Sequence, residues 1–156
     1  MSHPAEGSLA PDFTLLTDAG TPLTLSGLRG RPVVLYFYPK DDTPGCTVES
    51  CEFRDLMPRF AGVDAVILGI SPDDVKSHVK FRKKFDLPFQ LLADEGHTVA
   101  DVYGVWQEKS MWGRKYWGNA RTTFVIGGDG RVAKLFEKVK PEGHAAAVAE
   151  AVAALS

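Results

Sequence analysis

The sequence predicts an α/β protein in which a central mixed β-sheet is flanked by helices. Two apolar, β-branched runs at residues 32–38 and 63–70 are typical of strands buried on both faces of a sheet. Each run is followed by a segment with helical spacing, at residues 43–60 and 72–85. This alternation of strand and helix is the order expected when helices pack on a sheet.

The remaining elements are short and are separated by turn residues. They are predicted strands at residues 13–16, 22–25, 89–92, 122–126 and 132–136, and predicted helices at residues 98–103 and 143–155. The last two strands flank a Gly-Gly-Asp-Gly turn, which indicates a hairpin. Pro58 is expected to end or kink the long helix near Leu56. A thioredoxin-like core has this order of elements, so we expect a single thioredoxin-like domain over residues 1–156.

Composition and charge exclude several classes of protein. The 156 residues correspond to about one domain, and 18 basic residues oppose 20 acidic ones for a net charge of -2. No net positive charge draws the chain to nucleic acid or to a membrane surface. The longest apolar runs are too short to span a bilayer, and residues 1–7 lack the pattern of a secretory signal. We therefore expect a cytoplasmic protein with no nucleic-acid or membrane partner.

The chain contains two cysteines, Cys46 and Cys51, and the position of the first suggests reactivity. Thr43 followed by Pro44 is typical of a helix start, which places Cys46 in the first turn, directly after a strand-end loop. There the unpaired N–H groups and the positive end of the helix dipole stabilise a thiolate. The alternative is an inert, buried cysteine. The helix start favours a functional thiol.

The spacing of the two cysteines limits how they can pair. Five residues along an α-helix correspond to about 140° and ~7.5 Å, which separates the Cα atoms by roughly 8.6 Å. A disulfide needs Cα atoms within about 7 Å, so Cys46 and Cys51 cannot bond while the helix is intact. Cys51 is therefore either a core-facing residue beside Val48 and Phe53 or a partner that requires the first turns to unwind. The sequence lacks a Cys-x-x-Cys motif, which argues against a dithiol reductase.

The residues around Cys46 resemble a known family. Pro39-x-x-x-Thr43-x-x-Cys46 resembles the peroxiredoxin signature, and the longer run at residues 36–47 is similar to the bacterioferritin comigratory protein, or peroxiredoxin Q, branch. The resemblance covers nearly the whole chain. It also includes Ala-Pro-Asp-Phe at residues 10–13, Leu-Arg-Gly at residues 28–30 and Arg-Thr-Thr-Phe at residues 121–124.

This resemblance implies a role for five residues. Cys46 would be the peroxidatic cysteine that attacks the O–O bond of hydrogen peroxide or an organic hydroperoxide. Thr43 would bind the substrate and hold the thiolate, Pro39 would shield the pocket from water, and Arg121 would bring a guanidinium beside the sulfur. Cys51 would be the resolving cysteine.

The resemblance also implies a catalytic cycle. The sulfenic acid of Cys46 would condense with Cys51 to an intramolecular disulfide, and thioredoxin or a similar dithiol would reduce it. Such an enzyme needs no metal, haem or flavin, and would serve antioxidant defence as a monomer or weak homodimer. Two alternatives remain: a non-catalytic peroxide or redox sensor, and a thioredoxin-like disulfide reductase.

Other residues carry weaker signals. Glu49 is either a solvated helix residue or a partner that orients Arg121, and the charges at residues 40–42 are expected to be solvated in a loop. The aromatic segment at residues 106–117 is interpreted as a loop. It packs on the core, forms an apolar collar for the active site, or binds thioredoxin or a second subunit. We favour the collar.

The four histidines are scattered without the spacing of metal ligands. Surface or capping positions are expected for all of them, and no metal site is expected. They are His3, His78, His97 and His144.

Overall fold

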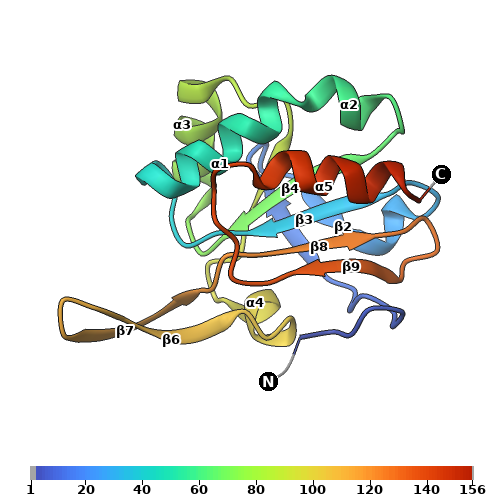
Figure 1. Ribbon diagram of the computed structural model, residues 1–156. Coiled ribbons are helices and arrows are strands. Elements are labelled where there is room, and N and C mark those ends of the chain that lie inside the picture. Colours follow the sequence, from blue (N-terminus) through green and yellow to red (C-terminus); the bar gives the residue numbers. More distant parts are fainter. Residues whose placement is uncertain (1–2, 156) are drawn as a thin grey trace.

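The computed structural model describes residues 3–155 and has strands and helices in the predicted alternating order (Figure 1). The strands are β1 (Thr14–Thr17), β2 (Pro22–Thr24), β3 (Val33–Phe37), β4 (Val66–Ser71), β5 (Gln90–Ala93), β6 (Trp106–Met111), β7 (Arg114–Asn119), β8 (Thr122–Ile126) and β9 (Val132–Phe136). The helices are η1 (Leu25–Leu28), α1 (Pro44–Asp55), α2 (Met57–Ala61), α3 (Val75–Phe85), α4 (Thr98–Val102) and α5 (His144–Ala153). No helix within residues 3–155 is long and apolar enough to cross a membrane.

Seven strands form one mixed sheet in the order β2-β1-β5-β4-β3-β8-β9. Strands β3, β4 and β5 are parallel neighbours, whereas β8 pairs with β3 in the antiparallel direction. The prediction of a mixed sheet flanked by helices is confirmed. Strands β6 and β7 form a separate two-stranded sheet that projects from the body of the molecule (Figure 1).

Both faces of the sheet are covered, and β3 is buried along its whole length. Its residues alternate between two apolar clusters, because successive side chains of a strand point to opposite faces. Tyr36 packs with residues of α1, α3 and α5, including Phe53 and Phe81. Phe37 packs on the other face with residues of η1 and α4. This burial explains the uninterrupted apolar run that predicted the strand.

The structure confirms one expected helix boundary and corrects another. The segment predicted as one helix over residues 43–60 divides into α1 and α2 at Leu56, as Pro58 suggested, because a proline cannot donate the backbone hydrogen bond that would continue α1. The helix predicted from residue 72 begins at Val75. Asp74 caps it by accepting a hydrogen bond from the Ser77 amide.

The interpretation of residues 106–117 as a loop is wrong. They belong to the β6–β7 hairpin, whose turn consists of Trp112 (φ 56°) and Gly113 (φ 76°). Two successive residues with positive φ are typical of a type I′ turn, in which Asn-Gly is the usual sequence. Trp112 occupies the position where Asn would have signalled the turn, so the hairpin was not recognisable from its turn residues.

Candidate active site

Cys46 lies where the sequence placed it, at the third residue of α1. The chain leaves β3, passes through a short loop and enters the helix at Pro44, with Thr43 as the N-cap residue in an extended conformation. Cys46 is fully buried, and both cysteines are free thiols. Because Cys46 lies in the first turn of α1, its side chain starts beside the backbone N–H groups that have no partner within the helix.

Arg121 brings its guanidinium directly to the sulfur of Cys46. Its Nη2 donates to Cys46 Sγ at 3.4 Å, and its Nη1 donates to Glu49 Oε1 at 2.7 Å. Sheet pairing explains the approach, since Phe37 at the end of β3 is the register partner of Thr122, the residue after Arg121. A Cβ atom at Gly45 would lie 3.0 Å from Arg121 Nη2, so this glycine leaves room for the guanidinium.

Glu49 is fully buried, so its interpretation as a solvated helix residue is wrong and its contact with Arg121 is confirmed. Burial raises the pKa of Glu49 to about 7, and this effect outweighs the opposing charge and hydrogen bond of Arg121. Its second oxygen, Oε2, has no hydrogen-bond partner among residues 3–155. His144 Nε2 lies 3.9 Å from this oxygen.

Thr43 and Pro39 line a groove that reaches the site. The groove has a volume of about 850 Å³, and Arg121, which also lines it, connects it to the buried sulfur of Cys46. The hydroxyl of Thr43 donates to the Lys40 carbonyl at 2.9 Å. The contact expected between this hydroxyl and the thiolate is therefore not formed in this state of the protein.

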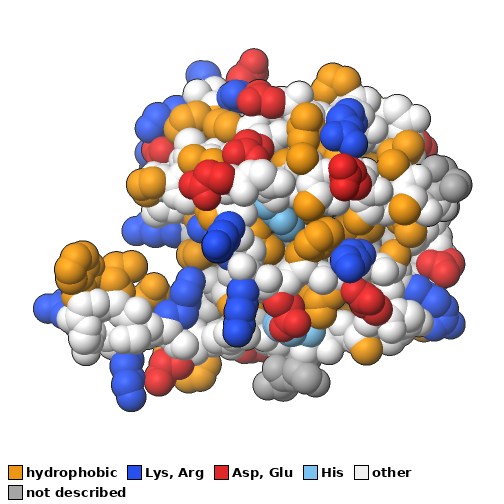
Figure 2. Space-filling model, in the orientation of Figure 1, with side chains coloured by type: hydrophobic (Ala, Val, Ile, Leu, Met, Phe, Trp, Pro, Cys, Tyr) orange, Lys and Arg blue, Asp and Glu red, His pale blue; other side chains and the backbone are white. Residues whose placement is uncertain are grey.

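The β6–β7 hairpin supplies the outer wall of the groove. Met111, Trp112, Tyr116 and Trp117 line it, and the exposed fractions of Trp112 and Trp117 are 93% and 58%. Figure 2 shows hydrophobic side chains gathered at the outer end of the hairpin, with basic side chains beside them. Trp106 at the base of the hairpin packs against the core, whereas the residues towards its outer end line the groove, as the collar interpretation expects.

Cys51 is partly buried on the same helix, five residues after Cys46. Burial raises the pKa of the Cys51 thiol, and the lowering by Arg54 does not cancel this effect. The uninterrupted helix between the two cysteines agrees with the prediction that they do not bond in this conformation.

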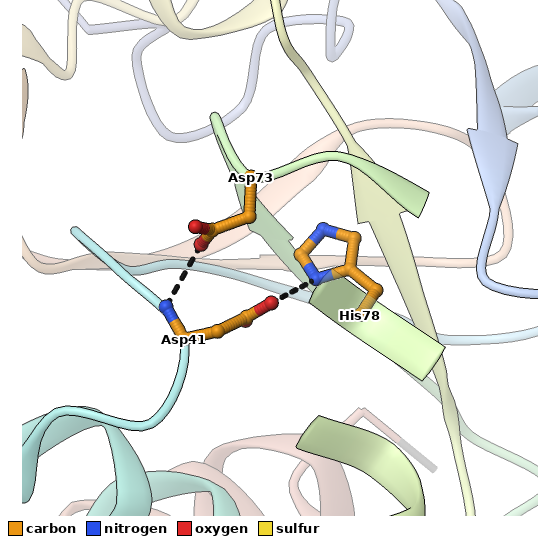
Figure 3. A group of neighbouring side chains, drawn as sticks. All are labelled: Asp41, Asp73 and His78. Carbon is orange, nitrogen blue, oxygen red and sulfur yellow. Dashed lines mark hydrogen bonds and ion pairs between the residues drawn. The ribbon is translucent and has the colours of Figure 1, made fainter. Parts of the chain in front are cut away.

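A buried polar network fixes the loop between β3 and α1 (Figure 3). The Asp41 carboxylate accepts from the Tyr38 hydroxyl and from Ser77 Oγ, and it lies 2.7 Å from His78 Nδ1. The Asp41 amide donates to Asp73 at 2.8 Å. The prediction that the charges at residues 40–42 are solvated is therefore wrong for Asp41.

The prediction of surface or capping positions is wrong for two histidines, His78 and His144, which are buried. Both ring nitrogens of His78 face acceptors, because Nε2 lies 2.9 Å from the Leu92 carbonyl. Burial lowers the pKa of His78, but the hydrogen bond and charge of Asp41 outweigh it, so the pKa lies above its usual value. The Asp41–His78 pair thus ties the loop to α3 and β5.

One potential ligand atom from each of Asp41, Asp73 and His78 lies within 4.8 Å of the other two, close enough to suggest a metal site. Both Asp41 oxygens and both His78 nitrogens are already engaged in hydrogen bonds or ion pairs with the protein. The network therefore acts as a structural tie. To recognise this network from the sequence, one would have to pair Asp41 with a histidine that lies 37 residues further along the chain.

A thioredoxin-like sheet that presents a cysteine at a helix start, beside a guanidinium, defines a thiol-dependent oxidoreductase. Residues 7–135 match the AhpC/TSA family. The chain is 51% identical to a putative peroxiredoxin Bcp of Coxiella burnetii, over 91% of this chain and 94% of that protein. It is 48% identical to peroxiredoxin Bcp of Bacillus subtilis, over 96% and 93%.

Solved structures agree with these relatives. A PrxQ structure from Xylella fastidiosa superposes with a TM-score of 0.92 at 36% identity, covering 99% of this chain and 98% of that one. A peroxiredoxin Q structure from Xanthomonas campestris gives a TM-score of 0.86 at 42% identity, covering 91% and 90%. The chain belongs to the AhpC/TSA family, in its Bcp and peroxiredoxin Q group, and is a thiol-dependent peroxidase.

Proposed function

We propose that Cys46 is the nucleophile of this peroxidase. The observation that supports it most directly is the guanidinium of Arg121, which donates to Cys46 Sγ at the start of a helix. The thiolate attacks the distal oxygen of a hydroperoxide, so that the S–O bond forms as the O–O bond breaks. Cys46 becomes a sulfenic acid, and the departing oxygen leaves as an alcohol or water after taking a proton.

Arg121, Thr43 and Pro39 assist this attack. The always-charged guanidinium stabilises the thiolate and the negative charge that develops on the peroxide oxygens. The Thr43 hydroxyl lies at the groove and reaches a bound peroxide by rotating away from the Lys40 carbonyl. Pro39 lines the groove with an apolar ring that carries no N–H donor, and in this proposal it shields the site from water.

The groove supports organic hydroperoxides as substrates beside hydrogen peroxide. Met111, Tyr116 and Trp117 provide apolar walls within reach of Arg121, where an alkyl group can leave water. Hydrogen peroxide needs none of this surface, because it has no apolar part to bury.

Cys51 resolves the sulfenic acid in this proposal. Its sulfur attacks the sulfur of Cys46, the S–S bond forms and water leaves. Both cysteines lie on α1, so the helix must unwind between them and no second subunit is needed. A dithiol reductant of the thioredoxin type then returns two electrons by thiol–disulfide exchange.

A peroxide-dependent NADPH-oxidation assay with thioredoxin and its reductase tests these roles. Cys46→Ser is expected to abolish turnover, because a serine hydroxyl is barely ionised near neutral pH. Cys51→Ser is expected to perform the first attack and then stall as a sulfenic acid. Near-parental turnover of Cys46→Ser would overturn the assignment. A single peroxide-consuming event in the parent, with no turnover, would instead favour a redox sensor.

A further inference from the structure

Arg121 lies between two buried acidic groups, and its single positive charge cannot balance both. One guanidinium nitrogen donates to Glu49 and the other donates to Cys46, and both acidic groups are fully buried. If both were ionised, the three groups together would carry a net negative charge away from water. Burial disfavours such an uncompensated charge.

His144 does not supply the missing positive charge. Its Nε2 lies 3.9 Å from Glu49 Oε2 and 2.8 Å from Thr123 Oγ1. Burial, followed by the charge of Arg121, lowers the pKa of His144 to about 4, so the ring is neutral near pH 7. Glu49 Oε2, which has no hydrogen-bond partner in the described part of the chain, is a free position for a proton.

The other groups around the site leave this imbalance in place. Glu52 on α1 adds negative charge that raises the pKa of Glu49. Tyr36 on β3 is buried, and burial raises its pKa well above the usual value, so it is neutral. Lys109 on β6 is a cation that interacts electrostatically with Cys46, but burial lowers its pKa, and its Nζ donates to the Asn119 carbonyl at 2.8 Å rather than to either acid.

We propose that Cys46 and Glu49 share one proton around Arg121, so that the Cys46 thiolate forms when Glu49 is protonated. Glu49 is then a positioning residue for charge, beyond its geometric contact with Arg121. The inference rests on Cys46 as the peroxide-reducing nucleophile. Two acids that interact this strongly lose their protons in two steps that belong to the pair. The burial of Glu49, which raises its pKa to about 7, supports the sharing at physiological pH.

The sharing keeps the buried site neutral through the reaction. Before attack, the thiolate balances Arg121 while Glu49 holds the proton. After attack, sulfenic acid carries no charge, so Glu49 releases its proton and becomes the counter-ion of Arg121. The alkoxide that leaves takes up one proton. Thiolate, protonated Glu49 and hydroperoxide thus become sulfenic acid, ionised Glu49 and alcohol, with no net gain or loss of protons.

The test follows the ionisation of Cys46 alone. In a Cys51→Ser chain Cys46 is the only thiol. Its thiolate fraction can be read against pH from ultraviolet absorbance and from the rate of alkylation by iodoacetamide. This chain is expected to form thiolate in two steps. Adding Glu49→Gln, which keeps an oxygen for Arg121, is expected to give one step whose midpoint is lower by about 1 pH unit or more.

The opposite shift would overturn the proposal. If Glu49 only orients Arg121, then Glu49→Gln leaves the midpoint unchanged or moves it to higher pH. Asp55→Asn is the matched control, because Asp55 is an exposed carboxylate on the same helix that pairs with Arg54. It is expected to leave the titration unchanged. The titration needs no turnover, so it is independent of the peroxidase assay that tests the role of Cys46.

A second measurement uses the parental Glu49 and avoids any folding defect of the variant. Alkylation of Cys46 with iodoacetamide replaces an ionisable thiol with a neutral group. The infrared band of the protonated Glu49 carboxyl, assigned by its absence in Glu49→Gln or by isotope labelling, is then expected to disappear at lower pH than in the unmodified chain. A band that titrates identically before and after alkylation would contradict proton sharing.

Discussion

Arg121 is central to the chemistry proposed for the site. Arg121 lines the exposed groove, and its guanidinium donates hydrogen bonds to both the sulfur of Cys46 and the carboxylate of Glu49. Burial alone would lower its pKa, but Glu49 and Cys46 raise it, so the guanidinium remains charged. A fixed cation in a buried position stabilises an anion far more than it would in water.

Replacing Arg121 with Ala is expected to slow the reaction of Cys46 with peroxide by about 100-fold, a loss typical of removing one donor to a developing anion. The thiolate fraction at a given pH should fall as well, because the nearby positive charge is gone. Rapid mixing with peroxide and a thiolate titration measure the two effects. Arg121→Lys should recover part of the rate, since it restores charge without the two-pronged geometry. Unchanged rate and titration in Arg121→Ala would make Arg121 only structural.

At the scale of elements, α1 and the loop before it have different tasks. The helix must open between Cys46 and Cys51 for a disulfide to form, whereas the loop that carries Pro39 and Thr43 is tied down by Asp41. Segments that open locally come from the less stable parts of a fold. In the proposed cycle, a firmly held loop beside an opening helix would let the site re-form after each turnover.

Hydrogen exchange at the amides of residues 46–52 tests the opening of α1. We expect protection in the reduced protein and fast exchange in the oxidised protein, because the disulfide is incompatible with helical spacing. A non-reducing mass measurement should show a monomer lighter by about two hydrogen atoms. Equal protection in both forms would show that the cysteines bond without unwinding or do not bond to each other.

The loop tie predicts a stability loss and a pH dependence. His78→Phe leaves the Asp41 carboxylate buried without its cation and is expected to cost about 3–5 kcal/mol in the free energy of unfolding. The folded pKa of His78 is raised, so its contribution is fully present below its unfolded value near 6.5 and is lost as pH rises through the folded value. Urea unfolding at several pH values measures both effects. A cost below about 1 kcal/mol would contradict a tie through charge.

For the whole molecule, the sheet was more predictable than the site. The two buried strands stood out because apolar burial on both faces leaves a continuous pattern, and the helix start of Cys46 was visible in Thr43 and Pro44. The Asp41–His78 ion pair was not predictable from the sequence, because only the folded sheet brings these two residues together. The β6–β7 hairpin escaped detection because its exposed strands carry no alternating apolar pattern.

In the proposed function, the hairpin forms a wall of the groove that selects for large substrates. Trp117→Ala is expected to raise the KM for a bulky alkyl hydroperoxide by about 10-fold. The substitution removes an apolar surface worth about 1–2 kcal/mol of binding free energy. The rate with hydrogen peroxide should be unchanged, since this small substrate does not reach the wall. Leu155→Ala, which removes an exposed apolar side chain not among those lining the groove, is the control. Equal losses with both peroxides would contradict a role in binding the alkyl group.

The assignment of Cys46 as the nucleophile is tested most directly by where the first oxygen goes. The Cys51→Ser chain is mixed with one equivalent of hydroperoxide, trapped with a reagent for sulfenic acids and mapped by peptide mass spectrometry. One oxygen atom, found as a trapped sulfenic acid on Cys46, is the expected result. A Cys46 that stays reduced while peroxide is consumed would contradict it.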